Sequence, residues 1–307
     1  MRYGRAMPKS KKSKGLLCEP PSSPYRVPFD GSFRIAKSST KPPKKAPQGK
    51  KGKKENKKAL EATIDIVREV QRKLYADDRY SILLVFQAMD AAGKDGTIRA
   101  VMTGLNPAGV QTSTFKKPST HELEHDFLWR VHQCTPERGR IGIFNRSHYE
   151  EVLIVRVAKL LGSRQVPRDP KHPWKERYES IRDFEKHLAR SGTLVLKFFL
   201  NVSRDEQKDR LLERLDDPAK NWKFEEGDLE VRDQWDEYME AYEAAINATS
   251  TPWAPWYAIP ADDKPYMRRQ VAEIFREAIE SLPLRWPKLH PDELARIDEW
   301  RARLEAD

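Results

Sequence analysis

The sequence predicts an α/β fold in which a mainly parallel sheet lies between two layers of helices. Five short apolar runs have the composition of strands that are buried on both faces. Segments with helical periodicity separate these runs, so strand and helix alternate along the chain. In sheets of this type ligands bind at the carboxyl ends of the strands, and polar residues that directly follow a strand are therefore the candidates for a site.

The first helix begins where apolar residues start to recur three or four positions apart, at Ala59. Further on, Ser119 with Glu122 has the pattern of a capping box that opens a continuous helix, in which Leu123, Phe127 and Val131 share a face. Ser203 with Glu206 repeats the capping box. Two longer helical patterns span residues 174–188 and 231–242. The predicted strands are residues 81–86 (SILLVF), 110–115, 141–144 (IGIF), 193–200 and 256–259.

Charge divides the chain into two parts. Residues 1–58 hold 18 of the 57 Lys and Arg residues and only three acids, whereas the remainder carries a net charge of −5. The lysine runs are mixed with Pro, Ser and Gly, a composition that buries too little apolar surface to offset chain entropy. We expect residues 1–58 to be a largely disordered extension, except that Tyr25 to Ile35 lies against the body. A solubilising role is favoured over an electrostatic arm for a polyanion.

Composition excludes several classes of protein. No run approaches the roughly 20 apolar residues of a membrane span, and charges stand where a secretory signal would be apolar. Cys18 and Cys134 are too few for a disulfide framework and lack the spacing of a zinc site. We expect a cytoplasmic protein with an ordered domain at residues 59–290, a lid at about 203–228 and a C-terminal helix at 291–307.

The strongest chemical pattern is the segment 87–97 (QAMDAAGKDGT), which lies between a buried strand and a helical segment. A phosphate-binding loop belongs at this place, because helix amides cradle phosphate and a lysine neutralises its oxygens. Ala88 replaces the first glycine of the usual motif and Asp95 replaces its hydroxyl residue. Asp90 adds a second carboxylate, and two carboxylates beside Lys94 indicate metal and phosphate together. An ordinary strand-to-helix turn with a solvated lysine is the alternative.

A second motif follows the strand at 141–144, where Asn145 stands in place of the expected aspartate. An amide oxygen can ligate magnesium but brings no charge, so Asp90 or Glu150 would supply it. Arg146 would face phosphate, although a strand-end turn with a surface cation is the alternative for this pair. We interpret His148 as structural.

At these motifs the chain resembles the polyphosphate kinase 2 family. The resemblance runs from about Tyr25 to Leu282 and includes QAMDAAGKDGTIR, IFNRSHYEEVLIVRV, SRDEQKDRLLERLDDPAKNWKF and APWYAIPADDK. It implies a three-layer P-loop kinase fold, similar to thymidylate kinase, with a helical lid. It also implies transfer of phosphoryl groups between polyphosphate and nucleotides. FNRSHYE and NWKF resemble the subgroup that accepts both AMP and ADP.

The resemblance assigns roles residue by residue. Catalytic roles fall on five residues: Asp90, Lys94, Asn145, Arg146 and Glu150. Asp90 is the metal ligand, for Mg²⁺ with Mn²⁺ as an alternative. Phosphate or nucleotide contacts are expected at Ala91, Ala92, Gly93, Asp95, Gly96, Thr97, Lys116, Lys117, Arg210, Arg214, Lys220 and Lys223.

The lid cations are not equivalent on a helical wheel. Leu211, Leu212 and Leu215 define an apolar stripe, Arg204 and Lys208 lie on that stripe, and Arg210 and Arg214 lie opposite it. The resemblance favours Arg210 and Arg214 as phosphate ligands. We expect Trp222 to anchor the lid by packing, with stacking on a base as the alternative. Lys116 and Lys117 either line a polyphosphate channel or end a strand in solvent.

The expected function is reversible, Mg²⁺-dependent transfer of the terminal phosphoryl group of polyphosphate to AMP, ADP or both. Adenine nucleotides, with guanine as an alternative, and polyphosphate are the expected partners. The resemblance implies a homodimer or homotetramer, whereas membrane and nucleic acid are not expected. An ATP-dependent nucleoside monophosphate kinase of the same fold is the main rival. A non-enzymatic polyanion binder is a more distant one, because only the basic tail supports it.

Overall fold

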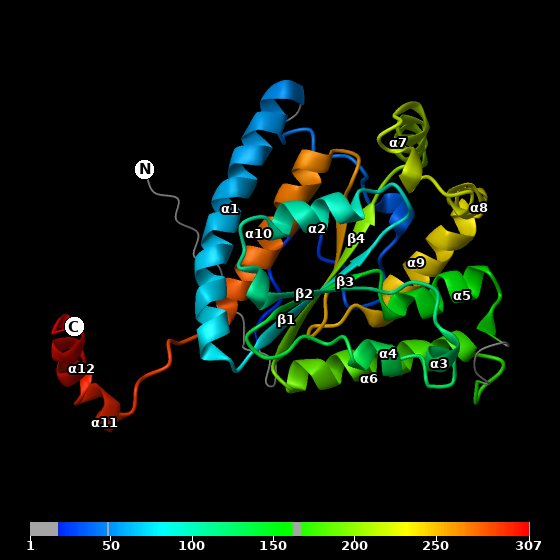
Figure 1. Ribbon diagram of the computed structural model, residues 1–307. Coiled ribbons are helices and arrows are strands. Elements are labelled where there is room, and N and C mark those ends of the chain that lie inside the picture. Colours follow the sequence, from blue (N-terminus) through cyan, green and yellow to red (C-terminus); the bar gives the residue numbers. More distant parts are fainter. Residues whose placement is uncertain (1–17, 48, 162–166, 307) are drawn as a thin grey trace, which may run out of the picture.

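The structure is a computed structural model that describes residues 18–47, 49–161 and 167–306. Its centre is one parallel sheet with the strand order β2-β3-β1-β4-β5 (Figure 1). All five predicted strands are confirmed, each with one end shifted by a single residue. They are β1 (Ser81–Gln87), β2 (Val110–Thr114), β3 (Ile141–Asn145), β4 (Thr193–Asn201) and β5 (Trp256–Pro260).

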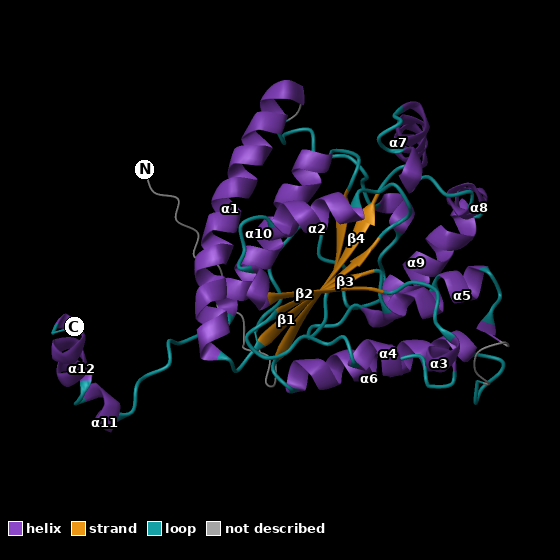
Figure 2. Cartoon of the chain, in the orientation of Figure 1, coloured by secondary structure: helices purple, strands orange, loops and turns teal. Residues whose placement is uncertain are grey.

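Helices cover both faces of the sheet, which confirms the three-layer α/β/α architecture (Figure 2). Strands β1, β4 and β5 are buried along their whole length, as strands between two helical layers must be. One layer consists of α1 (Gly49–Asp77), α2 (Lys94–Met102) and α10 (Lys264–Ser281). The opposite layer contains α6 (Pro173–Arg190), α9 (Trp235–Thr249) and the single-turn helices α3 (Thr120–Leu123), α4 (Trp129–His132) and α5 (Ile154–Val157).

Helix α1 begins at Gly49, ahead of the predicted start at Ala59, so the boundary at residue 58 lies inside a helix. Ion pairs one turn apart support these lysine-rich turns, for example Lys51 with Glu55 at 3.8 Å. The segment 25–35 lies against the body as predicted. The amide of Val27 donates to the carbonyl of Trp256 at 2.9 Å, and Val27 is buried. The lysine run 9–14 lies outside the described residues.

Two helix starts differ from expectation. The capping box of Ser119 and Glu122 is present, but the helix stops after one turn and a second turn forms at α4. The predicted continuous helix is wrong because Asp126 accepts the amide of Leu128 and closes a turn between them. At Ser203 only half of the capping box forms. The Ser203 hydroxyl accepts the amide of Glu206, but the Glu206 carboxylate accepts from the Arg210 guanidinium and not from the backbone of Ser203.

The chain leaves neighbouring strands toward opposite layers. After β1 it enters α2, and after β3 it enters the 3-10 helix η3 (His148–Val152) and then the layer of α6. In parallel sheets ligands bind at such a divergence, which here lies at the carboxyl ends of β1 and β3. Three short elements follow β4 beyond the sheet: α7 (Arg204–Asp216), η5 (Asn221–Lys223) and α8 (Gly227–Asp233).

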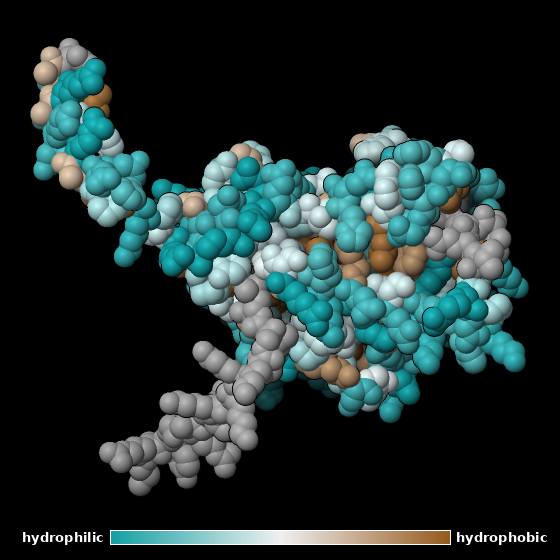
Figure 3. All heavy atoms as spheres, turned by 90° about the horizontal axis from the view of Figure 1, so that it is seen from below, coloured by the Kyte–Doolittle hydropathy of each residue, from teal (hydrophilic) through white to brown (hydrophobic). Residues whose placement is uncertain are grey.

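The last two helices, α11 (Pro291–Leu294) and α12 (Ile297–Glu305), stand apart from the body (Figure 3). Two further 3-10 turns are η1 (Ile35–Lys37) and η2 (Pro107–Gly109). Among the described residues no helix combines the length and the apolar character needed to cross a membrane.

Candidate active site

The loop between β1 and α2 has the backbone of an anion-binding turn. Ala91 and Gly93 adopt positive φ angles of 61° and 100°, and Gly93 caps α2 without any side-chain acceptor. The first amides of a helix have no partner within the helix and carry its positive dipole end. The sequence therefore leaves these amides available to an anionic ligand at the amino end of α2.

The second motif lies directly beside this loop, because Phe86 of β1 pairs with Asn145 of β3. Arg146, at a φ of 61°, turns its side chain back toward the loop, and its Nη2 donates to Oδ1 of Asp90 at 3.2 Å. Nδ2 of Asn145 donates to Oδ1 of Asp95 at 2.7 Å. The predicted catalytic residues of the two motifs are thus brought together at one edge of the sheet.

Burial shifts the pKa values of Lys94 and Glu150 in opposite directions. It lowers the pKa of Lys94 below the ordinary value of 10.5, and the nearby Arg146 adds to this effect while Asp90 and Glu150 oppose it. Burial raises the pKa of Glu150, against the attraction of Arg146 and Lys94. Groups whose pKa is shifted by burial and by a charged neighbour are typical of active sites.

The arrangement suits a phosphate group together with a cation. Asp90, Asp95 and Glu150 surround two positive groups, Lys94 and Arg146. Phosphate oxygens would bind to the helix amides and to Lys94. Without a metal ion, the three carboxylates would repel these oxygens. A divalent metal between acids and phosphate removes that repulsion.

Comparisons with known proteins agree with this geometry. The family model described as Polyphosphate kinase 2 matches residues 50–285. The chain belongs to the polyphosphate kinase 2 family. It is 50% identical over 249 residues, 80% of this chain and 86% of the relative, to the ADP-polyphosphate phosphotransferase of Rhodopseudomonas palustris. It is 48% identical over 267 residues to the AMP/ADP-polyphosphate phosphotransferase of Meiothermus ruber, covering 86% and 95% of the two chains.

Among solved structures, the polyphosphate kinase 2 of Arthrobacter aurescens TC1 superposes with a TM-score of 0.82 at 39% identity. The match covers 92% of this chain and 95% of that one. The chain is therefore a kinase with the P-loop kinase-like fold that the sequence predicted.

A buried polar network packs against η3, the turn that carries the second motif of the kinase. Lys197 on β4 is fully buried, and its Nζ donates to Glu185 at 2.6 Å, to the carbonyl of Thr249 at 2.8 Å and to the hydroxyl of Tyr149 at 2.9 Å. Glu185 also lies 3.3 Å from Nε2 of His148. His148 and Tyr149 belong to η3, so this network fixes the turn that carries Glu150. His148 is buried and contacts Glu185, which supports the structural interpretation.

Arg210 on α7 clasps the phosphate loop. Its guanidinium donates to the carbonyls of Ala91 and Ala92 at 3.3 and 2.8 Å, and to those of Ala261 and Asp262 at 2.7 and 3.1 Å. Five per cent of the side chain is exposed. Arg210 therefore lies at the loop, as predicted, but bonded to its backbone; a direct contact with phosphate stays a prediction.

The other lid cations pair within the lid. Arg214 donates to Asp228 at 3.1 Å, and Lys220 lies 2.7 Å from Glu213 and 2.9 Å from Asp217. The two pairs of Lys220 are exposed and therefore weak, whereas the side chains of Arg214 and Asp228 are only 23% and 10% exposed.

The predicted apolar stripe of α7 is wrong. Leu211 is buried, but Leu212 and Leu215 are 46% and 48% exposed, and Arg204 and Lys208 are exposed as well. The buried face holds Gln207, Arg210 and Leu211 instead, because backbone carbonyls of the loop satisfy the polar members of that face.

The prediction that Trp222 is a packing anchor is also wrong. Its side chain is 76% exposed, and its ring lies 5.0 Å from Nζ of Lys223. The indole NH donates to the carbonyl of Ala219, within the same short segment. The ring therefore lies on the lid surface and not between the lid and the body.

The remaining predicted residues fall into two groups. Lys116 and Lys117 are exposed after β2, away from the loop that follows β1. Thr97 is fully buried and its hydroxyl donates to the carbonyl of Gly93, so it stabilises the first turn of α2. Ala92 and Gly96 belong to the loop and the first turn of that helix.

Sequence reasoning missed several residues that contact the site. Gln207 donates to the carbonyl of Asp90 at 3.0 Å, and Asp228 lies near enough to Asp90 for its pKa to be raised, after burial, by that charge. On α10, Lys264 and Arg268 lie one turn apart beside α2. Their place directly after β5 is a signal that could have identified them, because that strand also ends at the ligand edge.

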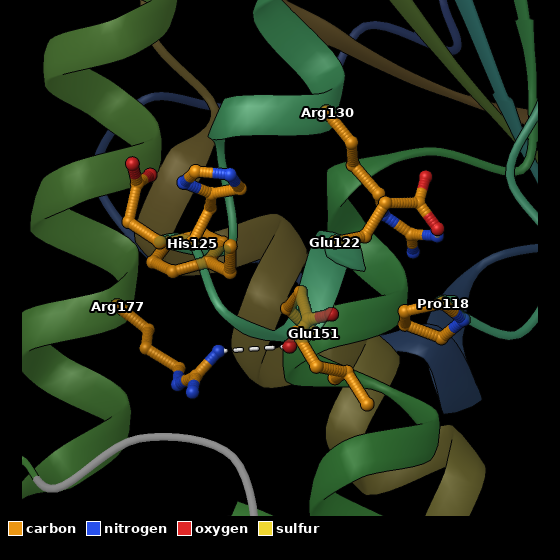
Figure 4. A pocket seen from close by; sticks show the side chains of 9 residues that line it. Pro118, Glu122, His125, Arg130, Glu151 and Arg177 are labelled. Atoms are coloured by element: carbon orange, nitrogen blue, oxygen red, sulfur yellow. Dashed lines mark hydrogen bonds and ion pairs between the residues drawn. The ribbon is translucent and has the colours of Figure 1, made fainter. Parts of the chain in front are cut away.

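A small hollow lies beside η3 (Figure 4). Residues from the α3–α4 segment, η3 and α6 line it, and Arg177 donates to Glu151 at 3.0 Å across one side. Glu151, which lines the hollow, follows Glu150 in η3.

Proposed function

We propose that this kinase transfers the terminal phosphoryl group of inorganic polyphosphate to AMP and to ADP, forming ADP and ATP. The observation that carries the proposal is the convergence of Lys94, Asp90, Arg146 and Glu150 on the free amides at the amino end of α2. The names of the R. palustris and M. ruber relatives support the donor and both acceptors.

Mg²⁺ is the cofactor that we propose, with Mn²⁺ as an alternative. The side chains present fit a hard cation, since Asp90 and Asp95 offer carboxylates and Oδ1 of Asn145 is buried without a hydrogen-bond partner among the described residues. No group of three or more His, Cys, Asp or Glu side chains forms a complete cage in the described part of the chain. Magnesium commonly shares its coordination with substrate phosphates. When bound, the ion neutralises charge on those phosphates.

The chain's own residues position and stabilise the reacting groups. Lys94 and the α2 amides hold the oxygens of the transferring phosphoryl, and Arg146, held by Asp90, faces the phosphate of the acceptor. An acceptor phosphate oxygen attacks phosphorus in line while the bond to the shortened polyphosphate breaks. No covalent intermediate on the enzyme is needed. When the lid closes, phosphate would take the place of the acids that pair with Arg214 and Lys220.

An ATP-dependent nucleoside monophosphate kinase is the alternative, and only donor identity separates the two. The purified kinase is incubated with Mg²⁺, long-chain polyphosphate and either AMP or ADP, without ATP, beside Lys94→Ala. Product from both nucleotides, with turnover at least about a hundredfold lower in the variant, supports the proposal. Product only when ATP is the donor would favour the alternative.

Adenine nucleotides are the proposed acceptors. A relative named GDP-polyphosphate phosphotransferase from Pseudomonas aeruginosa shares 34% identity over 199 residues, less than the two relatives above. Cytoplasmic location and a homodimer or homotetramer stay predictions from the sequence. The same holds for the domain limits at residues 59–290 and for the role of residues 1–58.

A further inference from the structure

Residues 33–40 form a strap that crosses the carboxyl ends of β4 and β5, beside the lid. Nδ2 of Asn201, the last residue of β4, donates to the carbonyl of Ser38 at 3.1 Å. The backbone of Thr40 pairs with the segment after β5, where the amide of Asp262 donates to the Thr40 carbonyl at 2.9 Å. The contacts that the sequence predicted for the N-terminal segment thus continue to the ligand edge of the sheet.

One carboxylate joins the strap to the start of α7, the first helix of the lid. The hydroxyl of Thr40 donates to Oδ2 of Asp262 at 2.8 Å, and Oδ1 of the same carboxylate accepts the amide of Ser203 at 2.8 Å. Ser203 is the N-cap of α7. Hydrogen bonds to a carboxylate are roughly twice as strong as those between neutral groups, so this pair of bonds holds the helix start in place.

Helix α7 in turn lies against the phosphate loop. Gln207 donates to the carbonyl of Asp90 at 3.0 Å. Arg210 donates to the carbonyls of the loop and also to the carbonyl of Asp262, at 3.1 Å. Both side chains lie within about two turns of Ser203, so a shift of the helix start would move both of them away from the loop.

The strap is itself held on either side of these contacts. The backbone of Phe33 exchanges two hydrogen bonds with the side chain of Asn247 on α9, at 3.0 and 2.9 Å, and the amide of Ile35 donates to Glu243 on the same helix at 2.8 Å. Helix α9 follows α8, so the strap contacts the chain on both sides of the lid. Beyond Thr40, two consecutive prolines at 42 and 43 restrict the backbone.

We propose that Thr40 is a positioning residue for phosphoryl transfer. It acts through Asp262 and Ser203, which hold α7 so that Gln207 and Arg210 keep the phosphate loop in its anion-binding conformation. Phosphate on the loop amides must be aligned for in-line attack, and a misplacement of about 1 Å can slow such a reaction about a hundredfold. The inference rests on the proposed function for the reaction that is assayed, but not for the placement of α7.

The test compares three substitutions in the strap. Thr40→Val keeps the shape of the side chain and removes the hydroxyl, whereas Thr40→Ser keeps the hydroxyl. Ser39→Ala is the matched control, because Ser39 is exposed and its hydroxyl donates to the nearby carbonyl of Lys41. With polyphosphate and ADP, Thr40→Val should lower kcat about tenfold, the loss of one hydrogen bond to a charged group. KM for both substrates should not change, because alignment matters at transfer.

The serine variant and the control separate positioning from a general loss of structure. Thr40→Ser should lose much less activity than Thr40→Val, and Ser39→Ala should keep the wild-type kcat. Wild-type kcat in Thr40→Val would overturn the inference. A loss in Thr40→Ser as large as that in Thr40→Val would overturn it as well, since the hydroxyl would then play no part.

Hydrogen exchange gives a second measurement, which needs no substrate. The amides of α7 should exchange about tenfold faster in Thr40→Val than in the wild type, while those of α6 in the opposite layer should not change and show that the variant is folded. If the wild-type kinase forms no ATP from polyphosphate and ADP, the proposed function fails. The exchange of α7 still decides the role of Thr40 in that case, and an unchanged rate would refute it.

Discussion

Arg210→Ala should destabilise the kinase as well as inactivate it. The side chain donates to four backbone carbonyls, two in the phosphate loop and two after β5. A hydrogen bond to a charged group contributes about 1.5–3 kcal/mol, but contacts made by one guanidinium are not additive. Losses above about 4–5 kcal/mol are exceptional for one substitution, so we expect the free energy of unfolding to fall by about 3–4 kcal/mol.

Denaturant unfolding of the wild type, Arg210→Ala and Arg210→Lys measures this loss. Lysine keeps the charge but cannot reach both pairs of carbonyls, so its stability should lie between the other two. Arg204→Ala is the control, because that side chain is exposed on the same helix and its loss should stay within about 0.5 kcal/mol. Equal stability of Arg210→Ala and Arg204→Ala would show that Arg210 does not clasp the loop.

Three further predictions concern the buried network around Lys197, the titration of Lys94 and Glu150, and the metal. Lys197→Met leaves Glu185 buried without its cation and should reduce the free energy of unfolding by about 3–5 kcal/mol. The double variant Lys197→Met with Glu185→Gln should lose less stability than Lys197→Met alone. Additive losses of the two substitutions in urea unfolding would refute the coupling. The alkaline limb of the kcat/KM profile should lie at a pH below 10.5, the ordinary lysine pKa, because transfer needs protonated Lys94. The acid limb should lie at a pH above 4.5, the ordinary glutamate pKa, because Glu150 must be ionised. Lys94→Arg should move only the alkaline limb upward, and an unmoved limb would exclude Lys94 as its source. Asp90→Asn should raise the Mg²⁺ concentration for half-maximal activity about tenfold, and an unchanged value would remove Asp90 from the metal site.

The sequence was sufficient for the sheet and for the two motifs beside it. Strands buried on both faces are mostly apolar and so stand out in the sequence; β1 and β4 are buried throughout, and Lys197 is the one charged residue in them. The loop at Gly93 and the turn at Asn145 follow adjacent strands, so their proximity follows from parallel topology alone.

The orientation of α7 could not be read in the same way. Periodicity ranks residues by hydropathy, and it placed three leucines against the body. In the structure Gln207 and Arg210 occupy that face, because carbonyls of the loop and of the segment after β5 accept their hydrogen bonds. Those carbonyls lie far away in sequence, so no local pattern contains them. The cations on α10 were missed although they follow β5, a strand that also ends at the ligand edge of the sheet.

Transfer of label from polyphosphate to nucleotide tests the central claim most directly. Polyphosphate labelled with ³²P is mixed with ADP, Mg²⁺ and an excess of the kinase, without ATP, and the reaction is stopped during a single turnover. The account predicts label in the γ-phosphate of ATP, none bound to the protein, and none in ATP with Lys94→Ala. Label on the protein, or ATP formed equally by the variant, would contradict direct transfer at the α2 loop.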